Sequence, residues 1–460
     1  MSPREFFALR DYLGPEIPGR TISDARYAIS LTNILSQSCL GGRAGELSSR
    51  AVLLALSGQL LSALAMIELD GMTRRMLLCP PDLDPAHLDR LILDAGIDAV
   101  VTDHPEFWKD RDIDLVIEAG LPSASGRRTA TERPTEWLML TSGTPGAPKI
   151  VKHTLEGLSG AIVADGTRGA AAIWATFYDI RRYGGLQIFL RAVIGAGSMV
   201  LSEPAEAPAD CVARFKARGV THVSGTPSHW RKLLMSGSAA GFAPAYVRLS
   251  GEIADQAVLD GLRLAFPAAS IGHTYASTEA GVGFAVNDGK EGFPASFVGA
   301  SRDGVEMRVV DGSLRIRSRR TAYAYVGQDV AALIDSDGFV DTGDMVELRG
   351  DRYYFIGRRG GIINIGGLKV HPEEIEAVIN AHAEVRMSRA RSRKSPITGA
   401  IVVADVVLAE GNCDGRSEAI RNQILEKCRA ALAPHKVPAT IRFVAALDVT
   451  AAGKLARADA

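Results

Sequence analysis

Apolar runs and polar turns alternate through the first third of the chain, and this pattern predicts alternating helices and strands. The longest apolar run, residues 51–67, is interrupted by polar residues and is short for a membrane span, so we predict a buried amphipathic helix there. A second helix is predicted over 85–95, with short strands at 98–102 and 137–140. Helices that alternate with strands in this way indicate a parallel α/β sheet.

Turn residues change the pattern in the second half of the chain. The α/β alternation continues to about Pro294, and short runs around Asp311-Gly312 then predict a hairpin within 299–317. A further turn at 335–338 lies inside a stretch, 330–356, whose short runs read as antiparallel strands.

A flexible junction and a small module follow. Gly360 and Gly361 permit unusual backbone angles and mark the junction. The module beyond it is long enough to be a domain of α+β type. Its predicted elements are helices at 372–381 and 417–432 and strands at 400–407 and 440–444.

Composition narrows the class of protein. The 460 residues are 47% hydrophobic and 23% charged, as in a soluble globular protein, and the net charge of -1 argues against a nucleic-acid binder. The five cysteines include no CxxC pair, which makes a zinc site or a disulfide framework unexpected and fits a reducing cytoplasm. Residues 1–20 have no apolar signal core. We therefore expect a cytoplasmic protein without a membrane or nucleic-acid partner.

The segment 141–149, Thr-Ser-Gly-Thr-Pro-Gly-Ala-Pro-Lys, follows an apolar strand and is a candidate phosphate loop. Its glycines let the backbone approach a phosphate, its hydroxyls and amides can donate to phosphate oxygens, and Lys149 supplies a mobile positive charge. It does not fit the Walker pattern, because Pro148 stands before the lysine. A surface loop of turn formers remains the alternative on composition alone.

This segment resembles the phosphate loop of the adenylate-forming superfamily, which includes acyl-CoA synthetases, firefly luciferase and the adenylation domains of nonribosomal peptide synthetases. The usual form there is Thr-Ser-Gly-Thr-Thr-Gly-x-Pro-Lys, so Pro145 is a departure that removes one hydroxyl and one amide donor. The resemblance implies a grip on the β- and γ-phosphates of ATP by Thr141, Ser142, Gly143, Thr144, Gly146 and Lys149.

Two further segments match the superfamily in order. Tyr275-Ala276-Ser277-Thr278-Glu279 resembles its Tyr-Gly-x-Thr-Glu motif, in which the threonine touches the α-phosphate and the glutamate holds Mg²⁺. A carboxylate is a suitable ligand for such a hard cation. Thr342-Gly343-Asp344 resembles its Thr-Gly-Asp, whose aspartate accepts from both ribose hydroxyls.

The last two matches lie at the junction and near the end of the chain. Gly357-Arg358-Arg359 with residues 364–376 resembles the superfamily's domain junction, which assigns Arg358 to ribose or phosphate and Lys369 to the CoA-facing stretch. Gly360 stands at the hinge position, often Asp or Lys, and a glycine can absorb large backbone rotations. Lys454, in Gly-Lys near the end, matches the lysine that reaches the carboxylate and the α-phosphate.

The resemblance implies the fold and the chemistry together. The expected fold is α/β: a large N-terminal adenylation domain, residues 1–358, of mixed and parallel sheets with helices and a β-barrel-like subdomain, and a small mobile α+β C-terminal domain, residues 359–460. The expected reaction joins ATP and a carboxylic acid, with Mg²⁺ near Glu279 and with Lys454, Thr278 and Glu279 as catalytic residues, to give an acyl-adenylate and pyrophosphate. A thiol of CoA or of a carrier-protein phosphopantetheine then yields a thioester and AMP.

The resemblance also implies where the acid and the adenine bind. Gly251 and Glu252 are expected against the adenine, with Ala276 nearby, and small residues there favour a flat aryl acid over a long fatty chain. Arg181 and Arg182 would face either a second carboxylate or, as we favour, solvent. The acid pocket is predicted to include Phe177, Tyr178, Asp179, Gly184, Thr226 and Gly281.

Several alternatives stay open from the sequence. Asp179 suggests pairing with a substrate amine, as in amino-acid-activating members, although the order Phe-Tyr-Asp differs from their Phe-Asp. The acyl group could pass to a non-thiol acceptor, an amine or a β-lactone. Pro145 and Gly360 alone favour a non-catalytic nucleotide binder, against the retention of Glu279, Asp344 and Lys454. The sequence does not decide the acid, the acceptor, or a monomer against a homodimer.

Overall fold

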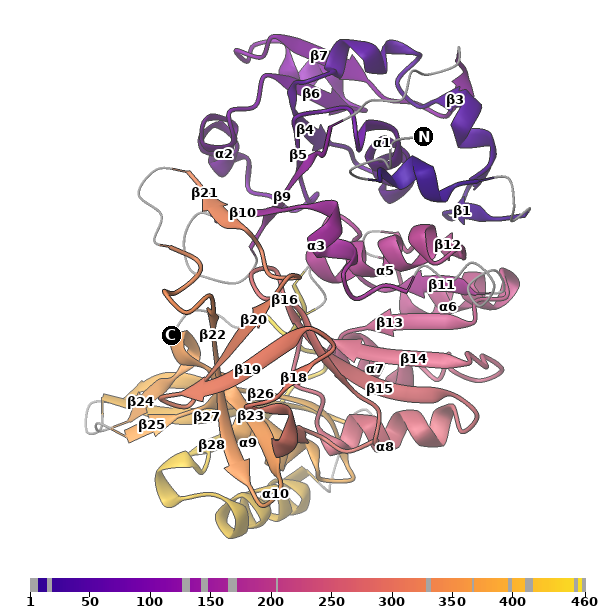
Figure 1. The fold of residues 1–460 in the computed structure, drawn as a ribbon. Coiled ribbons are helices and arrows are strands. Elements are labelled where there is room, and N and C mark those ends of the chain that lie inside the picture. Colours follow the sequence, from indigo (N-terminus) through magenta and orange to yellow (C-terminus); the bar gives the residue numbers. More distant parts are fainter. Residues whose placement is uncertain are drawn as a thin grey trace.

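The protein is layered, with three large sheets and a small C-terminal module that follow one another roughly in chain order (Figure 1). In the part of the chain that the structure describes, no helix is long and apolar enough to cross a membrane. The computed structural model describes residues 7–14, 19–125, 133–141, 148–163, 172–203, 206–327, 332–365, 368–395, 399–409, 417–450 and 454–456.

A seven-stranded sheet, in indigo and purple at the top of Figure 1 except for the orange β21, forms the first layer in the order β21-β10-β9-β5-β4-β6-β7. The five strands from β9 to β7 pair in parallel, which confirms the predicted parallel sheet, and β10 and β21 join antiparallel. The strands are β4 (Ala51–Ala55), β5 (Arg75–Leu78), β6 (Ala99–Thr102), β7 (Leu115–Glu118), β9 (Glu136–Leu140), β10 (Ile150–His153) and β21 (Ala324–Val326).

The helix predicted over 51–67 is wrong in its first part. Residues Ala51–Ala55 form β4, a central strand buried on both faces, and the helix α1 starts only at Gln59 and ends at Leu69. A fully apolar run has no period by which a buried strand can be told from a buried helix. The other early predictions are confirmed by α2 (Leu88–Ala95), β6 and β9.

An eight-stranded sheet forms the second layer in the order β16-β15-β14-β13-β11-β12-β1-β2, and its strands β13, β14 and β15 are pink in Figure 1. Its six inner strands are parallel, while β2 and β16 pair antiparallel at the edges. The strands are β1 (Thr21–Ser23), β2 (Ala28–Ser30), β11 (Ile173–Thr176), β12 (Ser198–Val200), β13 (His222–Gly225), β14 (Tyr246–Ser250), β15 (Ser270–Ser277) and β16 (Gly281–Val286).

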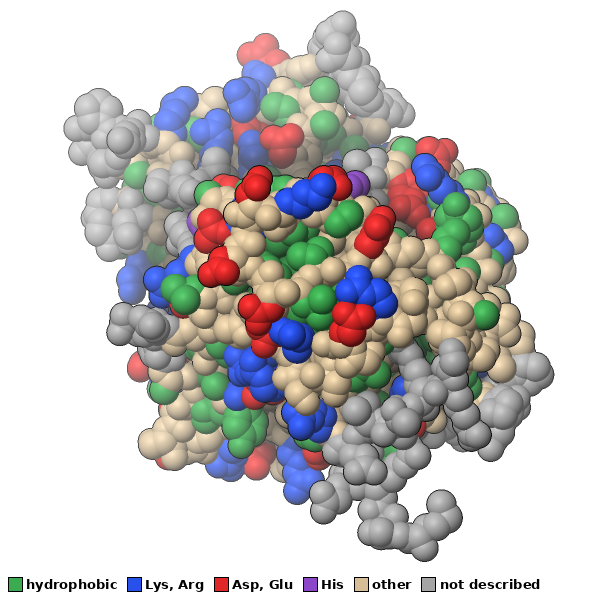
Figure 2. Space-filling model, turned by 90° about the horizontal axis from the view of Figure 1, so that it is seen from above, with side chains coloured by type: hydrophobic (Ala, Val, Ile, Leu, Met, Phe, Trp, Pro, Cys, Tyr) green, Lys and Arg blue, Asp and Glu red, His purple; other side chains and the backbone are tan. Residues whose placement is uncertain are grey.

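Helices cover this sheet and join it to the first. Leu60 and Leu64 of α1 share one hydrophobic core with Leu186 and Phe189 of α5. Burial of these two helices therefore stabilises the packing of the seven-stranded sheet against the eight-stranded sheet. Seen from above, acidic and basic side chains are interspersed over the top face, in keeping with the net charge of -1 (Figure 2). The helices are α3 (Leu155–Ser159), α5 (Tyr183–Ile194), α6 (Pro208–Ala217), α7 (Pro227–Met235) and α8 (Gln256–Ala265).

A six-stranded antiparallel sheet takes the place of the expected barrel-like subdomain, in the order β17-β23-β22-β20-β19-β18. Among the described residues its edge strands β17 and β18 do not pair, so it is an open sheet. The hairpin predicted around Asp311-Gly312 is confirmed, and both residues have the positive φ that a tight turn requires. The strands are β17 (Phe293–Pro294), β18 (Ser301–Arg302), β19 (Val305–Val310), β20 (Ser313–Ser318), β22 (Val340–Arg349) and β23 (Arg352–Arg358).

The C-terminal module has its own hydrophobic core, whose buried residues all lie between Ile363 and Ile441. Its predicted helices and strands are confirmed, while β24, β25 and β26 were not predicted, since β26 carries five basic residues in an irregular pattern. The elements are β24 (Ile363–Ile365), β25 (Leu368–Val370), α9 (Pro372–Asn380), β26 (Val385–Ser395), β27 (Gly399–Leu408), α10 (Ser417–Ala431) and β28 (Thr440–Phe443).

Candidate active site

A cleft of ≈ 1560 Å³ lies where the eight-stranded sheet, the six-stranded sheet and the C-terminal module meet. Parallel strands β14 and β15 end at this cleft, the edge at which open α/β sheets bind ligands. Of the predicted site residues that the structure describes, the following line it: Thr141, Lys149, Gly251, Glu252, Tyr275, Ala276, Thr278, Glu279, Asp344, Arg358 and Lys454.

Gly251 is the first residue after β14, and its φ of +84° is one that an L side chain rarely adopts. A Cβ at this position would lie 3.6 Å from Cε of Lys454 and 3.7 Å from Cγ2 of Thr226. The glycine therefore turns the chain sharply. Because it has no side chain, the side chain of Lys454 can pack close to its Cα. Thr226, predicted in the acid pocket, instead caps α7 by accepting a hydrogen bond from the backbone N–H of His229.

Thr278 and Glu279 sit in the hairpin between β15 and β16, where Ser277 pairs with Gly281. His153, buried beneath this hairpin, donates from Nε2 to the carbonyl of Thr278 over 2.7 Å, and burial lowers its pKa to about 4. The neutral ring thus fixes the backbone at Thr278. Gly281 does not line the cleft: a Cβ there would stand 2.1 Å from the carbonyl oxygen of Arg320.

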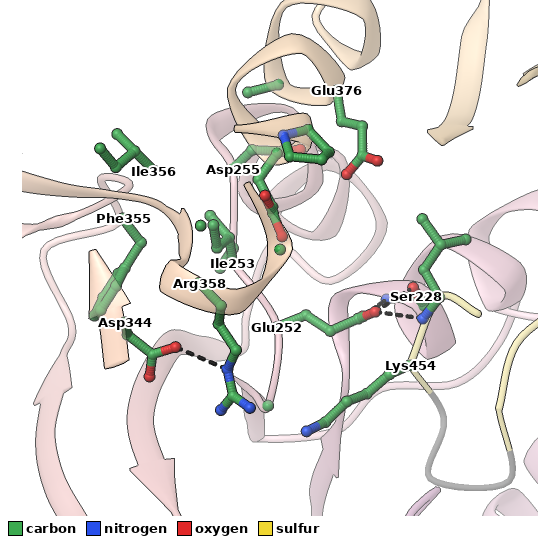
Figure 3. Close-up of a pocket in the computed structure, with 18 of the residues that line it drawn as sticks. Ser228, Glu252, Ile253, Asp255, Asp344, Phe355, Ile356, Arg358, Glu376 and Lys454 are labelled. Carbon is green, nitrogen blue, oxygen red and sulfur yellow. Dashed lines mark hydrogen bonds and ion pairs between the residues drawn. The ribbon is translucent and has the colours of Figure 1, made fainter. Parts of the chain in front are cut away.

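Asp344 and Arg358 are cross-strand neighbours in β22 and β23. Nε of Arg358 donates to Oδ1 of Asp344 over 2.9 Å (Figure 3). The hydroxyl of Tyr275 donates to Oδ2 of the same carboxylate over 2.5 Å. The negative charge of Asp344 raises the pKa of Arg358, and burial raises the pKa of Tyr275 well above its usual value. An acceptor, a cation and an aromatic ring are thereby fixed side by side.

Lys454 enters the cleft from the far end of the chain, and its side chain points into the same space as that of Arg358 (Figure 3). Burial lowers the pKa of Lys454, and the nearby Arg358 lowers it further, while Glu252 and Asp344 oppose the shift. An anion bound between the two cations would relieve their repulsion. The space between Arg358 and Lys454 can therefore accept an anionic group.

The phosphate-loop candidate is described only at its two ends. The backbone N–H of Thr141 donates to the carbonyl of Lys149 over 3.0 Å, and the backbone N–H of Lys149 donates to the threonine hydroxyl over 3.2 Å. These bonds close the base of the loop at the edge of the cleft. Ser142, Gly143, Thr144 and Gly146, with Pro145, lie outside the described residues.

Lys369 stands apart from the other predicted residues. It is an exposed residue of β25, in the hairpin with β24, and does not line the cleft. In this arrangement Lys454 is in the cleft and Lys369 is outside it.

The predicted acid pocket is largely filled by protein. Tyr178 is buried, donates from its hydroxyl to the carbonyl of Ser250 over 2.7 Å, and has ring atoms 3.6 Å from where a Cβ would stand on Gly184. Phe177 stacks on His229 at 5.6 Å between ring centroids. None of Phe177, Tyr178 and Gly184 lines the cleft, because aromatic packing occupies the space that the sequence assigned to a substrate.

Asp179 and Arg181 form a buried ion pair, so the expectation that Arg181 faces solvent is wrong. The guanidinium donates to the carboxylate from Nε over 2.8 Å and from a terminal nitrogen over 2.5 Å, and it also donates to the carbonyls of Leu56 and Ser57. The carboxylate of Asp179 is thus engaged within the protein and does not line the cleft. Arg182 does line the cleft, and it pairs with Asp82 there.

His153, which does not line the cleft, and the cleft residues Tyr325 and Ser228 are among the residues that we did not predict from the sequence. Tyr325 lies under Lys149, whose Nζ is 5.0 Å from its ring centroid, and Ser228 binds the carboxylate of Glu252. The sequence did contain a signal for His153. The strand after Lys149 alternates with period two, which places His153 on the inner face of β10. The contacts of Tyr325 and Ser228 arise only between distant segments.

Family models match most of this chain. The model described as AMP-binding enzyme matches residues 75–320, and the model described as AMP-binding enzyme C-terminal domain matches residues 374–454. The first match spans the phosphate-loop candidate, Glu252 and Glu279. The second ends on Lys454.

Individual relatives are more distant. The chain is 24% identical over 335 residues to a 2-succinylbenzoate–CoA ligase of Staphylococcus epidermidis, which covers 70% of this chain and 68% of the relative. It is 31% identical over 127 residues to the mitochondrial acyl-coenzyme A synthetase ACSM5 of Rattus norvegicus, covering 27% of this chain. The chain spans only 22% of the length of ACSM5 in that match.

Solved structures agree in fold along nearly the whole chain. The anthranilate CoA ligase AuaEII in complex with anthranoyl-AMP has a TM-score of 0.80 at 16% identity, covering 98% of this chain and 96% of its own. The amide bond synthetase McbA of Marinactinospora thermotolerans has a TM-score of 0.76 at 19% identity, covering 97% of each chain. The layered fold, the convergence of the five motifs on one region and the matched family models together show that this chain belongs to the AMP-binding enzyme family.

Proposed function

We propose that this protein activates a carboxylic acid with ATP to an acyl-adenylate and then transfers the acyl group to a thiol. The observation that carries the proposal is the meeting of Thr278, Glu279, Asp344, Arg358 and Lys454 around one cleft, although they come from strands of two sheets and from the end of the chain. Membership of the AMP-binding enzyme family and a ligase relative that acts with CoA support it.

In the first step a carboxylate oxygen of the acid attacks the α-phosphorus of ATP. The bond from that phosphorus to the bridging oxygen breaks, and pyrophosphate leaves with the electron pair. Two anions must approach each other for this, so cations that offset the charge supply much of the rate. Lys454 and Arg358, which project into the same space, are proposed to do so, and Asp344 is proposed to accept from the ribose hydroxyls.

A magnesium ion fits the residues present. Glu279 offers one carboxylate to the cleft, and in the described part of the chain no group of three or more His, Cys, Asp or Glu side chains could hold a metal ion. An ion held by one carboxylate takes its other ligands from phosphates and water, as Mg²⁺ commonly does. Bound there, it would neutralise phosphate charge during the transfer.

In the second step a thiol attacks the acyl carbonyl, AMP leaves with the electrons of the anhydride bond, and a thioester forms. CoA is the proposed acceptor, with a carrier-protein phosphopantetheine as the alternative source of the same thiol. The name of the ligase relative supports CoA. Lys369, outside the cleft here, would act only after the C-terminal module has turned.

The acid is proposed to be aryl. By their names, the 2-succinylbenzoate ligase relative and the anthranilate ligase neighbour act on aryl acids. The buried ring of Tyr178 shortens the space beside Gly251, which disfavours a long fatty chain.

We also infer that the chain divides at Arg358 into an N-terminal domain, 1–358, and a C-terminal domain, 359–460. A short 3-10 turn, Arg359–Gly361, follows β23, and the core beyond it is separate from the other cores. Gly360 has open space around the position of a Cβ, which suits a hinge.

Acid-dependent exchange of pyrophosphate into ATP over a panel of aryl, fatty and amino acids tests adenylation directly. We expect exchange with an aryl acid and release of AMP once CoA is added. If no acid in the panel supported exchange, the proposal would be rejected, and non-catalytic nucleotide binding would be the remaining function. Release of AMP only with an amine would replace the thiol by a nitrogen acceptor.

A further inference from the structure

Lys454 belongs to the segment 449–455, here called the Lys454 hairpin, whose two described ends pair with each other. Val449 and Leu455 form an antiparallel bridge, the backbone N–H of Thr450 donates to the carbonyl of Lys454 over 2.7 Å, and that of Lys454 donates to the threonine hydroxyl over 3.3 Å. Since Lys454 directly precedes the bridged residue Leu455, the position of the backbone there decides whether the amine reaches Gly251.

The carboxylate of Glu252 holds this hairpin from the N-terminal side. Oε1 accepts the backbone N–H of Leu455 over 2.7 Å, across 203 positions of sequence, and also the hydroxyl of Ser228 over 3.0 Å. Oε2 accepts the backbone N–H of Ser228 over 2.9 Å (Figure 3). All three bonds reach an ionised acceptor, the stronger class of hydrogen bond.

Glu252 is itself held in place. Ser228 is the second residue of α7, so the carboxylate lies at the N-terminus of that helix, where the helix dipole stabilises a negative charge. The backbone of Glu252 follows Gly251 directly and lines the cleft. One side chain therefore links α7, the turn after β14 and the segment that bears the proposed catalytic lysine.

The C-terminal module also binds the end of the Lys454 hairpin. Arg389 of β26 donates to the carbonyl of Ala456 over 3.1 Å, and it is oriented by Asp405, a buried carboxylate 3.1 Å away. The module thus carries the hairpin with it, while the contact with Glu252 exists only when the module is docked as seen here.

The geometry points to Glu252 as the positioning residue that latches the Lys454 hairpin into the cleft for adenylation and releases it for the thiol step. This inference rests on the proposed function for its kinetic consequence, but the latch itself is a contact that needs no substrate. The bond goes to a backbone N–H, so it sets the register of the hairpin whatever the side chain of Leu455 is.

Chemical labelling of Lys454 tests the latch without turnover. The folded protein is treated with an amine-acetylating reagent, and acetylation of Lys454 is followed by mass spectrometry relative to Lys109, whose side chain is 65% exposed. We expect Glu252→Ala to raise the relative labelling of Lys454 about tenfold or more, because loss of one charge-assisted bond shifts an equilibrium by roughly that factor. Labelling equal to that of the unaltered protein would overturn the latch.

The two half-reactions give the second readout. We expect Glu252→Ala to slow acid-dependent ATP–pyrophosphate exchange by roughly tenfold or more, through misplacement of the lysine, and to slow thioester formation from a synthetic acyl-adenylate by a clearly smaller factor. An equal loss of rate in both half-reactions would show that Glu252 does not act on adenylation alone, and would overturn the proposed role.

Variants at Glu252 and Ser228 distinguish an effect on the latch from an effect on local stability. Glu252→Gln keeps the shape but presents an N–H₂ group to the donors of Ser228 or Leu455, and should act in the same direction as Glu252→Ala with less effect on the thermal midpoint. Ser228→Ala removes one anchor of Glu252 and keeps the bond to Leu455, so its Lys454 labelling should stay below that of Glu252→Ala. Labelling that instead follows the thermal midpoints of all three variants would overturn the latch. Failure of exchange in the unaltered protein would reject the proposed function and leave the labelling test valid.

Discussion

Arg358 donates from Nε to Oδ1 of Asp344 over 2.9 Å, from the strand directly beside it. The pair lies at the mouth of the cleft, with the aspartate side chain 14% exposed and the arginine 49% exposed. Register between β22 and β23 alone brings the two together, so the antiparallel sheet places an acceptor for hydroxyl groups next to a cation for phosphate.

Replacement of Asp344 by Asn should selectively weaken the binding of ATP. The amide keeps the shape but offers one acceptor in place of two and loses its charge beside Arg358, so we expect the KM for ATP to rise roughly 10- to 100-fold. Exchange kinetics at varied ATP measure this. Asp337→Asn is the matched control, since Asp337 pairs with Arg308 away from the cleft. A similar KM in both variants would remove Asp344 from the nucleotide site.

Lys454→Ala should abolish adenylation and spare the thiol step. The alanine removes a cation from a partly closed site, where charge stabilisation is large, and we expect at least a 100-fold loss of ATP–pyrophosphate exchange. Thioester formation from a pre-made acyl-adenylate should remain largely intact. Lys109→Ala, at an exposed position, serves as control. Equal loss of both half-reactions contradicts the role given to Lys454.

Gly251→Val should crowd the lysine. The φ of +84° makes any side chain there strained by about 1–2 kcal/mol, and the γ-carbons would enter space beside Cε of Lys454. Gly350→Val is a matched control, because Gly350 also has a positive φ, +61°, with nothing within 4 Å of a Cβ. Both variants should lower the thermal midpoint, but only Gly251→Val should lose exchange activity more than tenfold. Equal activities would mean that Gly251 serves the turn alone.

His153 should make the fold sensitive to acid. Its folded pKa of about 4 lies below the ordinary value of 6.5, so between these values the unfolded chain binds more protons than the folded one. The stability contributed by neutral His153 is present above pH 6.5 and is lost as the pH falls towards 4, by about 3 kcal/mol in all. Urea unfolding of the unaltered protein and of His153→Phe, across pH 4–7, should show the difference between them shrink towards acid. A constant difference contradicts this.

Asp179 should behave as a structural residue rather than as a partner of a substrate amine. Asp179→Asn leaves the fully buried guanidinium of Arg181 without its counter-charge, and breaking such a pair costs roughly 3–5 kcal/mol. We expect a large fall in the denaturant midpoint and no preference for amino acids in the exchange panel. A stable Asp179→Asn variant that loses only amino-acid-dependent exchange would restore the amine hypothesis.

Much of the site was predictable because its motifs are local. The residues of Tyr275 to Glu279, Asp344 with Arg358, and Lys454 were recognised from short segments in a fixed order, and the cleft brings them together. The acid pocket was not predictable in the same way. Whether Tyr178 lines a cavity or fills it depends on the space beside Gly184 and Gly251, which belongs to packing between distant elements.

By itself the sequence determined the α/β class, the hairpin at Asp311-Gly312 and the order of the nucleotide motifs, since turn chemistry and short motifs act within a few residues. Only the tertiary structure decided that residues 51–55 are a strand, that Arg181 is buried against Asp179, and that Glu252 binds the backbone of Leu455. Each of those outcomes depends on which distant segment comes into contact, and burial settles it by removing water as the competing partner. No local pattern along the chain carries that information.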